Sequence, residues 1–200
     1  VHWHGTIRNN LRHWDTERER LVLHRVQFHH RSRARARWRV ILAVDQSGSM
    51  LDSLIHASVM AAVFAALPAL DVRLLLWDHR LVDMSHAVTD PLEVLMGVQL
   101  GGGTDLTPAL RWCADQVSEP ERTLVVVISD WYIWTKKVAA LAVARELHEA
   151  GVRCIGLCAL DADARPVYDK HFARALANAG WFVAALTPKE LADHVGGFLR

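Results

Sequence analysis

Five short apolar runs recur along the chain, and three of them stop abruptly at an acidic or hydroxyl side chain. None of the five alternates polar with apolar residues, a pattern typical of strands that are covered on both faces in a parallel sheet. The runs cover residues 40–44, 72–77, 124–128, 152–160 and 181–186. Stretches with helical spacing separate them, at residues 51–67, 107–117, 135–150, 166–179 and 188–199. Because strands and helices alternate, we expect an α/β fold with a doubly wound, mostly parallel sheet.

Local signals refine this expectation. Residues 81–84 follow the second run after a very short turn, which predicts a hairpin and therefore one antiparallel edge strand. Helix starts are marked at Thr107, which precedes a proline, and at Thr187, whose spacing to Glu190 fits a capping box. Gly151 follows the third helical stretch, where a left-handed residue commonly ends a helix. In such a sheet, ligands bind beyond the carboxyl ends of the strands.

The formal net charge of +1 conceals two unlike parts of the chain. Residues 1–40 contain 10 arginines and 3 acidic residues, whereas residues 41–200 contain 13 basic and 19 acidic residues. We therefore expect a basic N-terminal arm at residues 1–36, followed by one α/β domain at residues 37–200. Five arginines before the first run alternate strictly, which on an extended strand would place them on one face. They are Arg31, Arg33, Arg35, Arg37 and Arg39.

Three interpretations of these five arginines are open. They form a solvated or self-docked face, they clamp an acidic protein surface, or they contact the phosphates of a nucleic acid. A solvated or self-docked face is the simplest of the three. Binding to nucleic acid is less favoured, because the sequence contains no recognised nucleic-acid motif and no stacking aromatics interleaved with the arginines.

Cysteine content and hydropathy indicate in which cellular compartment the protein is expected. The three cysteines are an odd number and form no C-x-x-C pair, which argues against a secreted disulfide framework and against a zinc ribbon. Residues 53–70 are free of formal charge, but they are too few for a membrane span and include polar residues and a proline. We therefore expect a cytoplasmic protein that does not enter a membrane.

Oxygen-bearing side chains gather where the apolar runs end. Asp45 ends the first run, and the hydroxyls of Ser47 and Ser49 follow around a glycine that permits a tight turn. A glycine run brings in the hydroxyl of Thr104, and Asp130 ends a central run. Two carboxylates and three hydroxyls make a hard, oxygen-only set, which suits Mg²⁺, Mn²⁺ or Ca²⁺ better than zinc. Without a cation, the two acids on neighbouring strand ends would repel each other.

This three-part motif resembles the metal-ion-dependent adhesion site of von Willebrand factor A (vWA) domains. The arginine-rich lead-in before the first run further resembles the bacterial CoxE-like branch of that family. The resemblance implies that Ser47, Ser49 and Thr104 contact a metal through their hydroxyls, while Asp45 and Asp130 act directly or through water. It also implies that an Asp or Glu of a protein partner completes the coordination. The CoxE-like branch further implies an adaptor that works with a MoxR-type AAA+ ATPase.

The residues after Asp130 depart from the family pattern, because Trp131 and Tyr132 stand where a glycine is common. With Trp134, they place three aromatics in a loop that should be wet. Two interpretations are open. These aromatics form an exposed rim that binds the partner, as Trp and Tyr often do at interfaces, or they fold back onto the following helix.

An enzyme is the main alternative to a binding module, either a metal-assisted hydrolase or a phosphotransferase. The sequence contains no G-x-x-x-x-G-K phosphate loop, no G-x-G-x-x-G fingerprint and no G-x-S-x-G elbow. We therefore expect a protein that is not an enzyme. Asp78 also ends an apolar run but has no motif partner, so we expect a turn residue rather than a residue that supports the metal ligands.

Overall fold

The structure is a computed structural model of the 200-residue chain. It describes residues 3–10, 13–15, 18–21, 38–65, 70–86, 102–161 and 163–198. The chain divides into two compact units, Val1–Ala36 and Arg37–Arg200. That residues 1–36 serve as a basic arm stays a prediction.

The first unit contains a short helix and a pair of two-residue strands. Helix α1 (Trp3–Asn10) is followed by β1 (Trp14–Asp15) and β2 (Arg20–Leu21), which pair in antiparallel orientation. Within the helix, Asn10 Nδ2 donates to the carbonyl oxygen of Thr6 at 2.6 Å. Four of the five alternating arginines lie outside the described residues, namely Arg31, Arg33, Arg35 and Arg37.

Arg39 is the alternating arginine that the structure describes, and it docks on its own domain. Its Nε and Nη2 atoms lie 3.0 and 2.9 Å from Asp71 Oδ2 on the neighbouring strand. Its Nη1 atom donates to the carbonyl oxygen of Gln116 at 3.0 Å and to Ser118 Oγ at 3.1 Å. For this arginine, the self-docked interpretation is the one that the structure shows.

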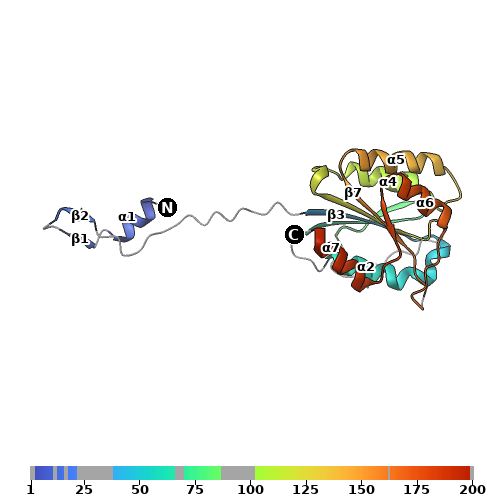
Figure 1. Ribbon diagram of the computed structural model, residues 1–200, viewed down its shortest axis with the longest axis horizontal. Coiled ribbons are helices and arrows are strands. Elements are labelled where there is room, and N and C mark those ends of the chain that lie inside the picture. The colour runs from blue at the N-terminus through green and yellow to red at the C-terminus, as the bar shows by residue number, and fades with distance from the viewer. Residues whose placement is uncertain are drawn as a thin grey trace. The chain divides into compact units, whose positions relative to one another are not determined.

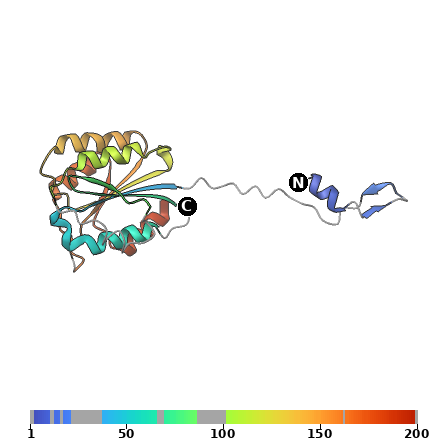
Figure 2. The same ribbon diagram turned by 180° about the vertical axis from the view of Figure 1, so that it is seen from behind.

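Six strands form the sheet of the second unit (Figure 1; Figure 2). They are β3 (Trp38–Asp45), β4 (Leu70–Trp77), β5 (Leu81–Asp83), β6 (Thr123–Ser129), β7 (Arg153–Cys158) and β8 (Phe182–Ala184). Their order across the sheet is β5-β4-β3-β6-β7-β8, and β5 is antiparallel to β4 while the other pairs are parallel. The predicted α/β sheet with one antiparallel edge strand is therefore confirmed.

Helices cover both faces of this sheet, as Figure 1 shows. One face carries α4 (Leu106–Asp115), α5 (Lys137–Glu149) and α6 (Lys170–Asn178), and the other carries α2 (Leu54–Ala65) and α7 (Pro188–Phe198). Two short 3-10 helices, η2 (Gly48–Ser53) and η3 (Pro120–Arg122), precede α2 and β6. Within the described ranges, no helix combines the length and the apolar character needed to cross a lipid bilayer.

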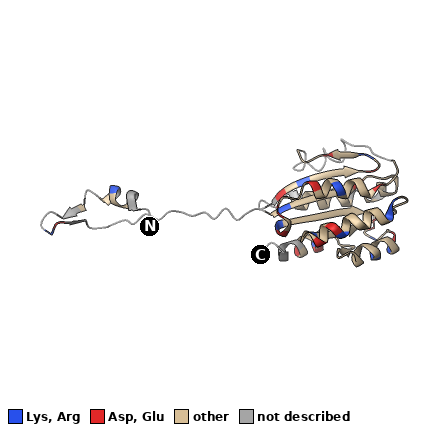
Figure 3. Cartoon of the chain, turned by 90° about the horizontal axis from the view of Figure 1, so that it is seen from above, with Lys and Arg blue, Asp and Glu red and all other residues tan. Residues whose placement is uncertain are grey.

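An apolar core fills each interface between helices and sheet. Successive strand residues point to opposite faces, so Ile41 and Val125 join one core while Leu42 and Val126 join the other. Full burial of each such side chain stabilises the fold by about 1.5–3 kcal/mol. The middles of β3, β6 and β7 carry no charged residue, whereas β4 includes Asp71 and Arg73. Figure 3 shows charged positions on the helices and on parts of the strands.

The helix boundaries agree with the sequence signals in part. The capping box at Thr187 and the left-handed Gly151 after α5, at φ +88°, are both confirmed. Helix α4 begins one residue earlier than expected, because the carboxylate of Asp105 caps it in place of the Thr107 hydroxyl. Helix α6 begins four residues later than expected, because Asp169 accepts the N–H groups of its second and third residues.

Candidate metal centre

The first candidate loop follows β3 and folds back on its own carboxylate. Asp45 is fully buried, and its Oδ1 atom accepts the N–H of Ser47 at 2.8 Å. The hydroxyl oxygens of Ser47 and Ser49 lie 3.3 Å apart. Next to them, the N–H of Gln46 donates to the carbonyl oxygen of Trp77 at 2.7 Å, which ties the loop to β4. The structure thus brings the first three predicted ligands together.

Ser129, the last residue of β6, joins the neighbouring strand to this loop. Its hydroxyl donates to Asp45 Oδ2 at 2.6 Å and accepts the N–H of Trp131 at 2.9 Å. The sequence interpretation did not include Ser129 among the site residues. Its position was the available signal, because it immediately precedes Asp130 at the end of a central strand.

Asp130 follows β6, which pairs with β3, so the two predicted carboxylates end neighbouring strands. Its Oδ1 atom accepts the N–H of Tyr132 at 3.1 Å. Its Oδ2 atom is buried and has no hydrogen-bond partner among the described residues. A buried polar atom without a partner costs about 1–3 kcal/mol, and more when it is charged. A bound cation would remove that cost.

The raised pKa of Asp45 also favours a bound positive charge at this site. Burial raises the pKa of Asp45 to about 6, although the hydrogen bonds from Ser129 and Ser47 favour its charged form. The negative charge of Asp130 adds to the rise. The buried Asp45 carboxylate is therefore destabilised as an anion unless a positive charge comes close to it.

The loop of Thr104 lies beside the end of β4. Thr104 is 7% exposed, and the N–H of the next residue, Asp105, donates to the main-chain carbonyl oxygen of Asp78 at 3.3 Å. The N–H of Gly102 donates to the Asp78 carboxylate at 3.1 Å. Since β4 pairs with β3, the third predicted element reaches the same edge of the sheet as the Asp45 loop.

The donor set fits a hard divalent cation. Two ligands at adjacent corners of a Mg²⁺ octahedron, each about 2.1 Å from the ion, lie about 3 Å apart, and the Ser47 and Ser49 oxygens are 3.3 Å apart. Across the described residues there is no cluster of three or more His, Cys, Asp or Glu side chains that could hold a metal. A cation at this edge would therefore depend on the serine and threonine hydroxyls as well as on the two carboxylates.

The prediction that Trp131 lies on an exposed rim is wrong. Trp131 is fully buried, and its indole N–H donates to Cys158 Sγ at 3.3 Å. Its ring stacks on Phe172 of α6 at a centroid distance of 6.2 Å. The left-handed backbone of Trp131, at φ +62°, turns the side chain back over the sheet, where Gly156 leaves room for it. A Cβ atom at Gly156 would lie 3.0 Å from the indole ring.

The other two aromatics of this loop do face solvent. Tyr132 is 39% exposed and Trp134 is 81% exposed. Val138, in the first turn of α5, is 83% exposed. That these side chains contact a partner stays a prediction.

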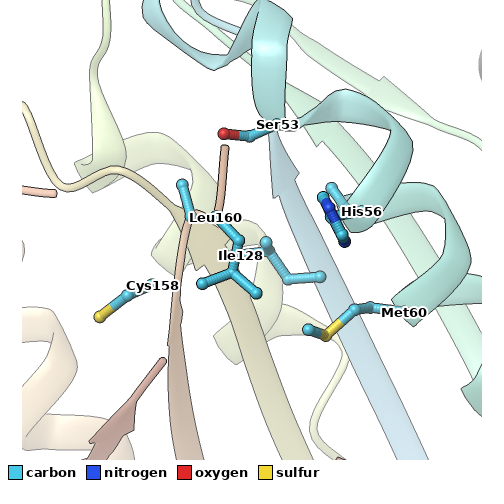
Figure 4. A pocket seen from close by; sticks show the side chains of 8 residues that line it. Ser53, His56, Met60, Ile128, Cys158 and Leu160 are labelled. Atoms are coloured by element: carbon cyan, nitrogen blue, oxygen red, sulfur yellow. The ribbon is translucent and has the colours of Figure 1, made fainter. Parts of the chain in front are cut away.

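A hollow lies next to the candidate centre, between α2 and the ends of β6 and β7 (Figure 4). Its lining includes Ser53, His56, Met60, Ile128, Cys158 and Leu160. Figure 4 shows that the Cys158 sulfur points away from His56, so these two side chains do not form a joint site. The hollow has a cavity volume of about 10 Å³, which is room for about one water molecule and far below the roughly 300–1,000 Å³ typical of small-molecule sites.

Solved structures with a similar fold include vWA domains. The manganese-loaded TRAP protein of Plasmodium vivax superposes with a TM-score of 0.63 at 18% identity, covering 82% of this chain and 74% of that one. An aerotolerance-related membrane protein of Bacteroides fragilis gives a TM-score of 0.62 at 15% identity, covering 80% of this chain and 97% of that one. A von Willebrand factor type A protein of Catenulispora acidiphila gives 0.55 at 16% identity, covering 82% and 42%. These likenesses show the fold.

A sequence relative and a family model assign the chain to a specific family. The uncharacterized protein YehP of Escherichia coli (strain K12) is 39% identical over 190 residues, which are 94% of this chain and 50% of that protein. This chain thus spans about half the length of the curated relative it matches. The family model of the VWA domain containing CoxE-like protein matches residues 1–195, which includes the arginine-rich lead-in. The chain therefore belongs to the CoxE-like family of vWA-domain proteins.

Proposed function

We propose that this chain is a metal-dependent protein-recognition module. A divalent cation sits at the carboxyl ends of β3 and β6, and an Asp or Glu side chain of a partner protein binds to it. vWA domains typically mediate protein–protein interaction, which supports the general class. The recognition of an acidic partner through a metal is the specific part of the proposal.

The observation that carries the proposal is the unpartnered oxygen of Asp130. This buried oxygen has no hydrogen-bond partner within the described part of the chain, and the pKa of the neighbouring Asp45 is raised by burial. Proteins seldom retain such a pair without a ligand that offsets the charge. Hydroxyl oxygens within 3.3 Å of each other complete a donor set of the type that Mg²⁺ accepts. A manganese-loaded vWA neighbour supports the use of a divalent cation in this fold.

Each predicted ligand has a distinct role in this proposal. The hydroxyls of Ser47, Ser49 and Thr104 hold the ion without adding negative charge, and Asp45 and Asp130 contribute directly or through water. When bound, the ion supplies a positive charge and an open coordination position for an outside carboxylate. Mg²⁺ is the expected ion, and Mn²⁺ and Ca²⁺ suit the same oxygen donors.

Exposed side chains beside the centre would contact the rest of the partner. Tyr132 and Trp134 follow Asp130 directly, and Trp134 is among the most exposed large apolar side chains that the structure describes. Aromatic residues of this kind often supply much of the binding energy at protein interfaces. We propose that they contact the partner next to its metal-binding carboxylate.

The wider role that we propose is that of an adaptor for a MoxR-type AAA+ ATPase. Its support is membership of the CoxE-like family. The partner is then the ATPase or one of its client proteins. The alternatives of a hydrolase, a phosphotransferase or a nucleic-acid-binding protein are not favoured by this family membership.

Affinity capture from the source cell tests the proposal. Wild-type chain and Asp45→Ala are compared in buffer with Mg²⁺ and in buffer with EDTA, and the captured proteins are quantified by mass spectrometry. We expect at least one partner that is retained by wild type in Mg²⁺ and lost both with EDTA and with Asp45→Ala. Restoration of that partner when Mg²⁺ is added back separates the metal effect from denaturation.

Asp163→Ala provides the control, because the Asp163 side chain is 71% exposed and lies outside the candidate centre. This variant should capture the same partner as wild type, in the same metal-dependent way. A set of captured proteins that is indifferent to EDTA and to Asp45→Ala would rule out the metal-bridge mechanism.

A further inference from the structure

Asp78 ends β4, the strand next to β3, and the sequence predicts that it is a turn residue. The structure shows that turn, because Asp78 Oδ1 accepts the N–H of Arg80 at 2.6 Å. The Asp78 side chain is nevertheless fully buried. A turn at the surface does not require burial of its carboxylate, so the second oxygen of Asp78 needs a separate explanation.

The other polar atoms of Asp78 reach a loop that lies far along the sequence. Its Oδ2 atom accepts the N–H of Gly102 at 3.1 Å. Its main-chain carbonyl oxygen accepts the N–H of Asp105 at 3.3 Å. The two contacts flank Thr104, the predicted metal ligand of this loop. Asp78 thus holds the backbone of the loop on both sides of the hydroxyl-bearing residue.

The packing and the charges around Asp78 are consistent with its contact to the Gly102 backbone. A Cβ atom at Gly102 would clash with the His79 imidazole and would lie 3.0 Å from Asp78 Oδ2, so this close approach favours glycine. Asp78 Oδ2 also lies 3.2 Å from His79 Nδ1 and 3.5 Å from Arg80 Nη2. The Asp78 carboxylate therefore lies beside the His79 and Arg80 side chains of its own turn. By contrast, Asp130 Oδ2 has no partner in the described ranges.

We propose that Asp78 is a positioning residue, which holds the Gly102–Asp105 loop so that the Thr104 hydroxyl faces the metal. The inference rests on the proposed metal site, but the anchoring of the loop can be measured without metal. Residues that orient metal ligands commonly change the metal affinity by about 10- to 100-fold when they are mutated. We expect an effect of this size here.

Two variants and one matched control test the role of Asp78 in the full chain. Asp78→Ala removes the carboxylate that accepts from Gly102 and Arg80 but keeps the main-chain carbonyl that accepts from Asp105. Asp78→Asn keeps one acceptor oxygen in nearly the same volume. Asp83→Ala removes a carboxylate from the same hairpin, where it accepts only from Ser85 among the described residues. Amide hydrogen exchange in EDTA and Mg²⁺ affinity by calorimetry are measured for each.

In EDTA, the Gly102 amide of Asp78→Ala loses its acceptor and should exchange at least about tenfold faster than in wild type, while the amides of β6 keep their protection. The Mg²⁺ affinity of Asp78→Ala should fall by about 10- to 100-fold. Asp78→Asn should lie between wild type and Asp78→Ala, and Asp83→Ala should match wild type in both measurements. A general loss of stability would instead accelerate exchange throughout β6.

Unchanged exchange at Gly102 in Asp78→Ala would overturn the proposal. Faster exchange with a Mg²⁺ affinity within about twofold of wild type would overturn it too, because the loop position would then not matter to the metal. If wild type itself binds no Mg²⁺, the proposed metal site fails, and the exchange measurement still decides whether Asp78 anchors the loop.

Discussion

Asp45 and Asp130 end neighbouring strands, but their carboxylates have different hydrogen-bond partners. Both oxygens of Asp45 accept hydrogen bonds, from the Ser47 N–H and from the Ser129 hydroxyl. In Asp130, Oδ1 accepts a hydrogen bond and Oδ2 has no partner in the described ranges. We therefore expect Asp130 to offer an oxygen directly to a cation, and Asp45 to act mainly through its charge or through water.

The buried Trp131 and the exposed Trp134 predict opposite mutational effects. Trp131→Ala leaves a large cavity against Phe172 and Gly156, so we expect it to lower the free energy of unfolding by about 3–5 kcal/mol. Urea unfolding followed by circular dichroism measures this loss. A variant as stable as wild type would contradict the packing of Trp131.

Trp134→Ala should leave the stability of the chain within about 0.5 kcal/mol of wild type, because the side chain is 81% exposed. If Trp134 contacts the partner, the variant should bind the captured partner more weakly by about 1–2 kcal/mol, or roughly 5- to 30-fold. Val59→Ala, at a residue of α2 that is 45% exposed, is the control. Equal partner affinity for Trp134→Ala and wild type would remove Trp134 from the interface.

For single residues, the sequence could predict a role in the site where that role depends only on the position of the residue along one strand or turn. Asp45, Ser47 and Ser49 are close in sequence, so one tight turn brings them together. The burial of Trp131 could not be predicted in this way. It depends on the left-handed backbone of Trp131 and on the space above Gly156, which lies on another strand.

The start of α6 supports the loop that carries Asp130. Asp169 caps this helix with its side chain, and its own N–H donates to the carbonyl oxygen of Asp130 at 2.8 Å. Lys137 at the start of α5 donates to Asp169 Oδ2 at 3.3 Å. The sequence did not predict this helix start, because a proline at residue 166 looked like a suitable first residue and the contacts of Asp169 come from elsewhere in the fold.

We expect Asp169→Ala to destabilise the chain by about 1 kcal/mol at neutral pH through loss of the cap. Partial burial acts to raise the pKa of Asp169, but hydrogen bonds from Phe172 and His171 and the charge of Lys137 outweigh it, so the pKa is lowered. The charged cap therefore stabilises the fold above the ordinary Asp pKa of about 3.9. This contribution is lost as the pH falls through the lowered folded pKa.

Urea unfolding at neutral pH and at increasingly acidic pH measures this dependence. The stability difference between wild type and Asp169→Ala should shrink as the pH falls below about 3.9. Asp169→Asn keeps a capping oxygen but cannot titrate, so it should retain most of the cap without this pH dependence. A difference that stays constant with pH would contradict the charged cap.

For the whole molecule, the order of strands and helices could be predicted because the central apolar runs, which form β3, β6 and β7, are buried along most of their length. The strand runs therefore stand out from the amphipathic helices in the sequence alone. Contacts that join distant segments, such as Ser129 to Asp45 or Gly102 to Asp78, are set by sheet order and loop packing. Residues 1–36 form a unit of their own, and the role of that unit stays a prediction.

The central claim is that buried negative charge at the ends of β3 and β6 is retained to hold a cation. Thermal unfolding of wild type and Asp45→Asn, each in EDTA and in Mg²⁺, tests it most directly. Asn is nearly isosteric with Asp but carries no charge. Removal of a buried charge favours the folded state, whereas loss of the Asp45 charge that attracts the metal, directly or through water, abolishes stabilisation by the metal.

In EDTA, Asp45→Asn should be at least as stable as wild type. Wild type should gain about 2.7 kcal/mol when free Mg²⁺ is about 100 times its dissociation constant, and Asp45→Asn should gain little or nothing. Asp163→Asn should behave like wild type in both conditions. If Mg²⁺ does not stabilise wild type, or if it stabilises Asp45→Asn equally, these carboxylates do not form a metal centre.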